Sequence, residues 1–206
     1  PREAPGSAAD ILTTLPAFGL KADAPSLFQS QRRAAYDAAF DHLRASDLLF
    51  PCWCSRRELE PVAGIHRDGR CTTSAEPDRP PAWRLRVPDR EVHFHDALQG
   101  PQRQNLRRQV GDFVIRRADG LYTYQLACVV DDAFQQVTEV VRGHDLLDST
   151  ARQIWLQRCL DLPTPAYRHL PLVLDVDGQK LSKSARALPV DTADPLPALH
   201  RAASFL

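Results

Sequence analysis

The chain has 206 residues, a length that suits one compact domain or one domain with a small insert. Lys and Arg number 26, as do Asp and Glu, so a nucleic-acid partner would have to bind a local patch and not the field of the whole protein. A hydrophobic fraction of 43% excludes disorder as the default, and without an apolar run of about 18 residues we expect no membrane span.

Cysteine usage indicates the redox compartment. The chain has five cysteines, an odd number, and three of them cluster. No apolar signal segment follows Pro1. This pattern favours metal binding in a reducing cytoplasm over a disulfide framework.

Two helices are expected near the start of the chain. The first would run from a cap at Ser7 through Leu15 and end near Gly19. The second lies within residues 26–47, with Ser30 as its cap. Its apolar residues share one face at helical spacing and are expected to enter the core: Tyr36, Ala39, Phe40 and Leu43.

A β-prone run, Leu48–Trp53, leads into a set of metal-binding residue types: Cys52, Cys54, His66 and Cys71. Three thiolates and an imidazole supply the four ligands of a closed tetrahedral zinc site. The metal would fix a loop that has little core of its own, and we expect a structural role because no open coordination position is evident. The alternative is three unrelated cysteines and a surface histidine.

The segment that follows contains one helical turn and two strands. Ser55–Glu58 has the pattern of a capping box, while Trp83–Val87 and Glu91–Asp96 alternate as strands do. His93 and His95 could be metal ligands, but half-exposed strand residues are the simpler interpretation. A solvated face, or as the minority interpretation contact with tRNA phosphates, is expected for a basic cluster: Arg103, Arg107 and Arg108.

A hairpin, a helix and a strand are predicted in the next part of the chain. Asp112–Arg116 and Leu121–Tyr124 flank a turn at residues 118–120. A helix should follow over Gln125–Phe134, and Val137–Val141 reads as a strand.

Tyr124 and Arg142 both fall at the carboxyl ends of predicted strands, where ligands bind in open α/β sheets. A guanidinium fork suits a carboxylate, and a phenol offers an oriented hydroxyl. The alternative places Tyr124 in the core and pairs Arg142 with Asp131 or Asp132. Asp145 would cap a helix that continues through residues 146–160.

A turn at Asp177-Gly178 is predicted to present a short basic loop: Lys180, Leu181, Ser182, Lys183 and Ser184. Its two ammonium groups and two hydroxyls could neutralise a triphosphate as pyrophosphate leaves. The alternative is a solvated surface loop. A closing helix is expected within residues 188–206 around Leu196, Leu199 and Phe205.

Lys180–Ser184 resembles the Lys-Met-Ser-Lys-Ser signature of class I aminoacyl-tRNA synthetases, with Leu181 in place of the usual Met. Much of the chain is similar to the glutamyl-queuosine tRNA(Asp) synthetases, which are short relatives of the glutamyl-tRNA synthetase catalytic domain. Matches to that family's glutamate-binding segments occur at residues 124–127, 129–132, 140–143 and 145–147.

The resemblance implies a Rossmann-like α/β catalytic domain over residues 1–206 that lacks its N-terminal part, with a zinc-bearing insert at 48–111. The family's first strand and phosphate-binding signature would lie upstream of Pro1. By the same resemblance Tyr124 and Arg142 contact the amino acid, and Lys183 is the catalytic residue that contacts ATP. The family often has Tyr where this chain has His66.

The implied reaction activates L-glutamate with ATP, accompanied by Mg²⁺, and transfers it to the queuosine base of tRNA(Asp). We expect a cytoplasmic monomer. Two other functions stay open: a non-catalytic, zinc-stabilised module that binds tRNA or a protein, and the catalytic core of an ordinary glutamyl-tRNA synthetase. The short segment after Ser184 disfavours the last.

Overall fold

The computed structural model describes residues 5–76, 78–174, 178, 180–181 and 190–206. The chain divides into two units, one formed by Gln29–Pro171 and the other by residues 1–28 together with 172–206. Within the described ranges no helix has the length and apolar character needed to cross a membrane.

The larger unit contains an antiparallel sheet of three strands in the order β1-β2-β5. These strands are β1 (Leu49–Cys52), β2 (Ala82–Leu85) and β5 (Phe113–Arg116). Each lies within about two residues of the strand expected from its apolar alternation. The sheet therefore places Cys52, the last residue of β1, in the same layer as β5, although β5 comes much later in the chain.

A second sheet has the order β4-β3-β7-β6. β3 (Glu91–Asp96) has the predicted bounds, and β4 (Gly100–Asn105) pairs antiparallel with it. β7 (Ala166–Leu170) runs parallel to both β3 and β6 (Glu139–Gly143). β4 was not predicted, because its polar, proline-containing sequence lacks β-prone residues and it depends on pairing with β3.

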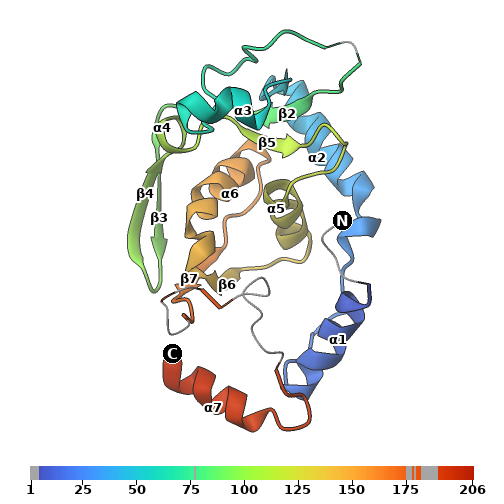
Figure 1. Cartoon of the computed structure of the whole chain (residues 1–206), viewed down its shortest axis with the longest axis vertical. Coiled ribbons are helices and arrows are strands. Elements are labelled where there is room, and N and C mark those ends of the chain that lie inside the picture. The colour runs from blue at the N-terminus through green and yellow to red at the C-terminus, as the bar shows by residue number, and fades with distance from the viewer. Residues whose placement is uncertain (1–4, 77, 175–177, 179, 182–189) are drawn as a thin grey trace. The chain divides into compact units, whose positions relative to one another are not determined.

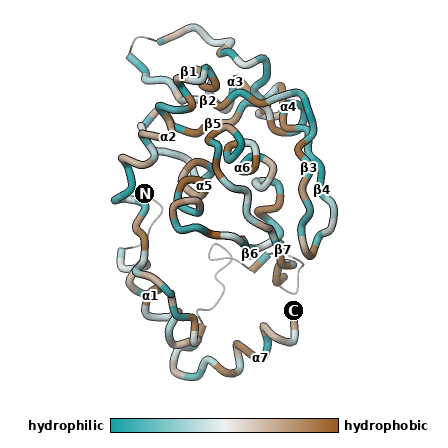
Figure 2. Tube along the Cα trace, turned by 180° about the vertical axis from the view of Figure 1, so that it is seen from behind, coloured by the Kyte–Doolittle hydropathy of each residue, from teal (hydrophilic) through white to brown (hydrophobic). Residues whose placement is uncertain are grey.

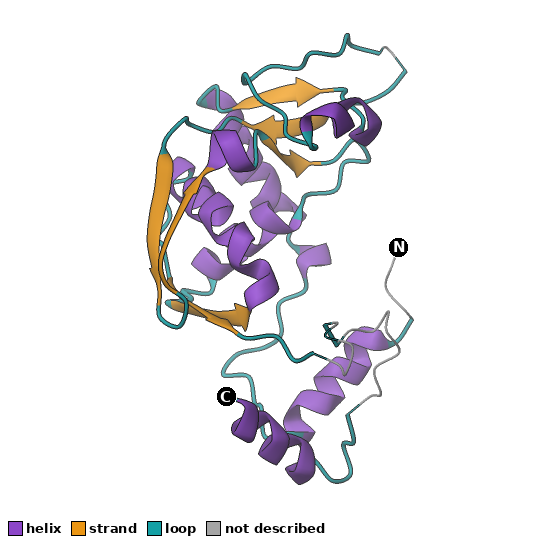
Figure 3. Ribbon diagram, turned by 60° about the vertical axis from the view of Figure 1, so that its left-hand side comes forward, coloured by secondary structure: helices purple, strands orange, loops and turns teal. Residues whose placement is uncertain are grey.

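Two of the longer helices, α5 (Tyr124–Phe134) and α6 (Leu147–Cys159), lie between the two sheets in Figures 1 and 3, and α2 (Arg33–Ala45) packs against α5 and β1. The predicted apolar face of α2 is buried at Tyr36, Phe40 and Leu43. Complete burial of a leucine side chain contributes roughly 1.5–3 kcal/mol, so this shared core is what holds the helices against both sheets. The side chains with no exposed surface include Leu43, Leu85, Leu106, Ile115 and Leu126.

Helix starts differ from the predicted caps. Ser30 lies in the 3₁₀ turn η1 (Gln29–Gln31), and Arg32 occupies the N-cap of α2. Asp145 similarly lies in η3 (His144–Leu146), so that Leu146 is the N-cap of α6. In both places a 3₁₀ turn precedes the α-helix and moves its start beyond the capping side chain.

The larger unit also contains short helical elements, two of them after Cys54 and one that contains Arg107 and Arg108. They are α3 (Arg56–Leu59), η2 (Glu60–Val62) and α4 (Leu106–Gln109). The predicted capping box is present at the start of α3, where the Ser55 side chain accepts from the Glu58 amide and the Glu58 carboxylate accepts from the Ser55 amide.

The smaller unit contains α1 (Ser7–Ala17) and α7 (Leu196–Phe205), close to the two predicted helices. Neither helix buries a side chain, and exposed apolar residues mark both in Figure 2. Leu174 and Lys180 form an antiparallel bridge, and Gly178 has φ +74°. The chain therefore reverses direction between Leu174 and Lys180, as the Asp-Gly pair predicts; Asp177 lies outside the described residues.

Candidate functional site

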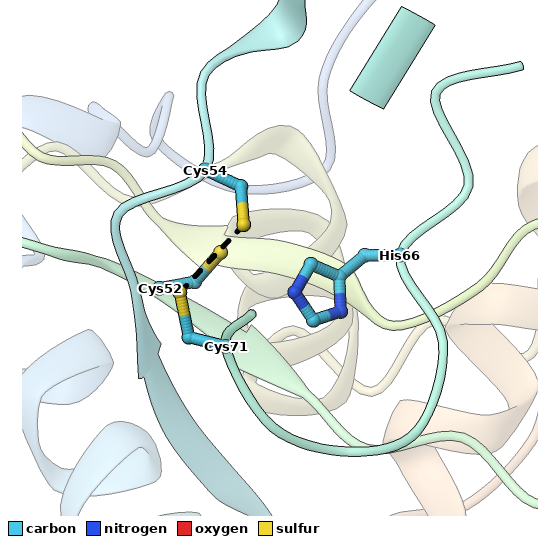
Figure 4. Close-up of side chains that lie close together, drawn as sticks. All are labelled: Cys52, Cys54, His66 and Cys71. Carbon is cyan, nitrogen blue, oxygen red and sulfur yellow. Dashed lines mark hydrogen bonds between the residues drawn. The ribbon is translucent and has the colours of Figure 1, made fainter. Parts of the chain in front are cut away.

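The four predicted metal ligands come together in the larger unit. One ligand atom from each of Cys52, Cys54, His66 and Cys71 lies within 4.8 Å of the others. Figure 4 shows the three sulfur atoms grouped beside the imidazole ring. The Sγ atoms of Cys54 and Cys71 are 3.6 Å apart, and both cysteines are free thiols. This donor set, three sulfurs and one nitrogen, is that of a closed tetrahedral zinc site.

Local structure explains how ligands distant in sequence converge. Cys52 ends β1, where its Cα pairs with that of Ala82. The capping box that starts at Ser55 turns the chain immediately after Cys54. The Trp53 amide donates to Sγ of Cys71 over 3.1 Å, so the backbone between the first two cysteines also holds the third.

The environment of His66 fits a ligand role. Its side chain is buried, and both ring nitrogens lack a hydrogen-bond partner among the described residues. Nδ1 lies 3.6 Å from Oδ2 of Asp112, beyond hydrogen-bond distance. Buried polar atoms without partners are rare, and a bound cation would satisfy one of these nitrogens. The carboxylate of Asp112 and the sulfur of Cys52 raise the pKa of His66 to about 9, so metal binding would displace a proton.

Sequence reasoning missed two residues that support this cluster, Arg84 and Asp112. Arg84 is buried, and its Nε donates to Sγ of Cys52 over 3.1 Å. Burial raises the pKa of Cys52, but the neighbouring imidazole of His66 and the hydrogen bond from Arg84 outweigh it and bring the pKa below its ordinary value. Zn²⁺ bound by three thiolates would carry a formal charge of −1, and the Arg84 guanidinium would offset it. The alternation of β2 could place Arg84 on a face but could not show that this face is buried.

Gly111 holds the backbone of His66 in place. It forms a parallel bridge with His66 and has φ +74°. A Cβ at this position would collide with the carbonyl oxygen of His66 and would lie 2.7 Å from Cγ2 of Ile65. Only glycine therefore satisfies both the conformation and the close approach.

We expect Gly111→Ala to lower the free energy of unfolding by roughly 3 kcal/mol or more, since a collision with backbone adds to the left-handed strain. Gly120→Ala is the matched control, because Gly120 also has a positive φ but a Cβ there meets no described atom within 4 Å. Its cost should be only about 1–2 kcal/mol. Urea unfolding of both variants measures the difference, and equal costs would contradict the collision.

A second group of predicted residues meets at β6. Arg142 is the penultimate residue of β6, and Tyr124 is the first residue of α5. Nη1 of Arg142 donates to the hydroxyl of Tyr124 over 3.4 Å. The expected strand end at Tyr124 is thus a helix start, because Thr123 makes the last sheet-like hydrogen bond, to Ile115. The structure nevertheless brings the phenol and the guanidinium together.

The structure tests part of the alternative interpretation, in which Tyr124 lies in the core and Arg142 pairs with an aspartate. Asp131 does not pair with Arg142; it accepts hydrogen bonds from Tyr36 over 2.6 Å and Arg32 over 3.1 Å. Tyr124 is 47% exposed, so it is not a core residue. Burial raises the pKa of Tyr124, and the phenol is therefore a neutral hydrogen-bonding group at pH 7.

The other predicted residues have different outcomes. His93 and His95 are exposed on β3, and His93 lies 3.1 Å from Glu91, as expected of strand residues. Two members of the basic cluster form ion pairs at the surface, Arg107 with Asp68 and Arg108 with Asp89. Lys180 and Leu181 are exposed. Three residues of the predicted ATP loop lie outside the described part of the chain: Ser182, Lys183 and Ser184.

Comparison with known proteins gives consistent matches. Residues 1–194 match the family model described as "tRNA synthetases class I (E and Q), catalytic domain". A glutamyl-Q tRNA(Asp) synthetase from Burkholderia cenocepacia is 52% identical over 217 aligned residues, which cover 100% of this chain and 73% of that protein. Another from Xanthomonas axonopodis pv. citri is 55% identical over 203 residues, covering 98% of this chain and 67% of that protein.

Solved structures show the same relationship at the level of fold. A glutamate tRNA ligase from Elizabethkingia meningosepticum, crystallised with its amino acid, superposes with a TM-score of 0.75 and 25% identity. The match covers 89% of this chain and 43% of that one. The glutamate-tRNA synthetase of Elizabethkingia anophelis gives the same score over 93% of this chain and 47% of that one.

Proposed function

Because the chain belongs to the glutamyl-Q tRNA(Asp) synthetase family, within the class I synthetase catalytic domains, we propose that it activates L-glutamate with ATP and transfers it to the queuosine of tRNA(Asp). In the first step a carboxylate oxygen of glutamate bonds to the α-phosphorus of ATP while the bond to the leaving pyrophosphate breaks. In the second step a hydroxyl of queuosine takes the glutamyl group and AMP leaves. ATP would react with Mg²⁺ bound to its phosphates.

The pairing of Arg142 with Tyr124 is the single observation that carries the proposal most directly. A guanidinium and a phenol meet at the carboxyl end of a parallel strand, which is where open α/β sheets bind ligands. We assign both residues to the glutamate site. A ligand with a carboxylate would pair with the guanidinium, whereas an analogue without one would leave it unpaired.

We propose that the loop Lys180–Ser184 binds ATP and that Lys183 stabilises the charge of the departing pyrophosphate. The support is its sequence, two ammonium groups and two hydroxyls within five residues, together with the chain reversal that precedes it. No covalent intermediate with a side chain is needed, since positioning and charge stabilisation suffice for this chemistry.

Lys183→Ala should depress glutamate-dependent ATP–pyrophosphate exchange by roughly 100-fold, because one stabilising group of the transition state is lost. Lys21→Ala is the matched control, since Lys21 is an exposed lysine of the same unit. Its exchange rate should stay within about twofold of the wild type, the range expected for a surface change. An unchanged rate for Lys183→Ala would remove this loop from the mechanism.

We propose further that Cys52, Cys54, His66 and Cys71 hold a structural zinc ion within a small insert at residues 48–111. When bound, zinc would crosslink the chain between β1 and β2, where the described residues form only the short elements α3 and η2. Thiolate ligands persist in a reducing compartment, and on this ground we place the protein in the cytoplasm.

ATP–pyrophosphate exchange with glutamate, first without tRNA, tests the proposed function. Exchange without tRNA, followed by glutamate transfer to tRNA(Asp) that carries queuosine, is the expected outcome. Dependence on tRNA(Glu) would instead indicate an ordinary glutamyl-tRNA synthetase. Binding of tRNA without exchange in any condition would indicate a non-catalytic module.

A further inference from the structure

Two buried residues outside the predicted site are connected to Arg142 by hydrogen bonds. His169 contacts Arg142 directly, and Asp96 contacts His169. Arg142 on β6 and His169 on β7 are Cα partners in the parallel register. Nε of Arg142 donates to Nε2 of His169 over 3.0 Å. Nδ1 of His169 in turn lies 2.6 Å from Oδ2 of Asp96 on β3. The three side chains form one hydrogen-bonded line across three neighbouring strands.

The chemistry of these atoms fixes where the imidazole proton must be. An arginine Nε always carries hydrogen, so Nε2 of His169 must offer a lone pair to accept it. The ring proton then resides on Nδ1 and is donated to the carboxylate of Asp96. An imidazole protonated on Nε2 would place two donors face to face and break the contact with Arg142.

The surroundings of Asp96 keep its carboxylate in place to accept the Nδ1 proton of His169. Its side chain has no exposed surface, and Oδ1 accepts from the backbone amides of Leu98, Gln99 and His169 over 2.9–3.2 Å. Burial raises the pKa of Asp96, but hydrogen bonds from His169 and these amides outweigh it and lower the pKa to about 2. The carboxylate is therefore ionised and fixed at both oxygens.

A further contact fixes another corner of the guanidinium. Nη2 of Arg142 donates to Oγ1 of Thr150 over 2.9 Å, and Thr150 is fully buried on α6. The contact of Nη1 with the half-exposed Tyr124 is longer, at 3.4 Å. Short hydrogen bonds thus hold Nε and Nη2, and the Nη1 edge remains for a ligand. The groups that hold Nε and Nη2 are uncharged, so they orient the guanidinium without neutralising it.

We propose that Asp96 and His169 are positioning residues that orient Arg142 toward the carboxylate of glutamate, by fixing the Nδ1–H tautomer of His169. This inference rests on the proposed function, because it needs glutamate as the ligand of Arg142. The competing explanation is that the pair only ties β3 to β7. The two differ in one respect: orientation of Arg142 depends on the position of a proton, and a structural tie does not.

Asp96→Asn isolates that difference. The asparagine Oδ1 can keep the backbone hydrogen bonds, while its amide donates to Nδ1 and moves the ring proton to Nε2. We expect KM for glutamate in ATP–pyrophosphate exchange to rise roughly 10- to 100-fold, since a buried donor of Arg142 then faces another donor. KM for ATP should change less than about twofold, because ATP contacts neither residue in this proposal.

Gln157→Leu is the matched control. Gln157 is also a buried polar residue of the larger unit, but its Nε2 donates to the hydroxyl of Tyr167 and ties α6 to β7. We expect it to lower the thermal midpoint as Asp96→Asn does and to leave KM for glutamate unchanged. If Asp96→Asn behaves like Gln157→Leu, with lower stability and the same KM, the positioning role is wrong.

Two substitutions of His169 provide a rescue test. The amide of His169→Gln reaches the position of Nε2 and can accept from Arg142, whereas that of His169→Asn reaches only the position of Nδ1 and can serve Asp96. The positioning role predicts a lower KM for glutamate in the Gln variant than in the Asn variant. A lower KM in the Asn variant would favour the structural tie and overturn the proposal.

Imidazole ¹⁵N NMR separates failure of this inference from failure of the proposed function. We expect His169 of the wild type to be protonated on Nδ1 and that of Asp96→Asn on Nε2. A wild type that activates glutamate but carries the Nε2–H tautomer contradicts the inference alone. A wild type with the Nδ1–H tautomer that neither activates nor binds glutamate contradicts the proposed function and the ligand assigned to Arg142.

Discussion

Arg142→Ala is expected to lower kcat/KM for glutamate in ATP–pyrophosphate exchange by roughly 100- to 1000-fold, with KM for ATP nearly unchanged. Removal of one partner of a desolvated, hydrogen-bonded charge pair costs about 2–5 kcal/mol, and each 1.4 kcal/mol corresponds to about a tenfold change. The substitution also leaves the buried Nε2 of His169 without the donor that it meets at 3.0 Å. Steady-state exchange at varied glutamate and ATP concentrations measures both effects.

Arg142→Lys tests whether the charge or the shape of the side chain matters. Lysine keeps the positive charge but lacks the planar fork and the Nε donor, so we expect it to recover little of the lost activity. Arg103→Ala is the control, because Arg103 is exposed on β4 and the exchange reaction contains no tRNA. Activity of Arg142→Ala within about threefold of the wild type would place glutamate selection elsewhere in the protein.

Cys71→Ser is expected to reduce bound zinc from one equivalent to less than about a tenth and to destabilise the larger unit by at least roughly 3 kcal/mol. The reason is that the described residues among 53–81 contain only α3 and η2 as regular structure, and the metal would supply most of their crosslinks. Metal analysis of the purified protein gives the stoichiometry, and denaturant unfolding gives the stability.

The matched control for the metal site is Cys159→Ser. Cys159 is also a free thiol, at the end of α6 and outside the ligand cluster. This variant should retain one equivalent of zinc. A wild type purified without chelator that contains no zinc, or a Cys71→Ser protein that keeps a full equivalent, would make the cysteines bystanders.

The metal ligands could be identified from the sequence, because residue type and spacing are both local signals. Cys52 and Cys54 flank one residue at the end of a short apolar strand, and the capping box after Cys54 is read directly from Ser55 and Glu58. The residues that support the ligands carry no such signal. Arg84 lies on β2 and Asp112 immediately precedes β5, and their contacts depend on the pairing of β2 with β1 and β5.

The same division applies to the glutamate site. Position at a strand end and residue type identified Arg142 and Tyr124 as candidates, although the helix start at Tyr124 was assigned one residue late. Asp96 ends a predicted strand, whereas no strand is predicted around His169, and no motif surrounds either residue. They meet Arg142 because β7 lies between β3 and β6 in the sheet. This strand order makes neighbours of residues that are distant in the sequence.

The sequence by itself determined the chemical groups of this protein: four soft metal ligands, a guanidinium with a phenol, and a basic loop after a glycine turn. It also determined most helices and strands, since hydrophobic period and turn residues act over a few positions. Only the tertiary structure decided which buried polar groups touch them. Burial and strand order depend on the packing of the whole unit, and a hydrogen bond between β6 and β7 has no trace in the period of either strand.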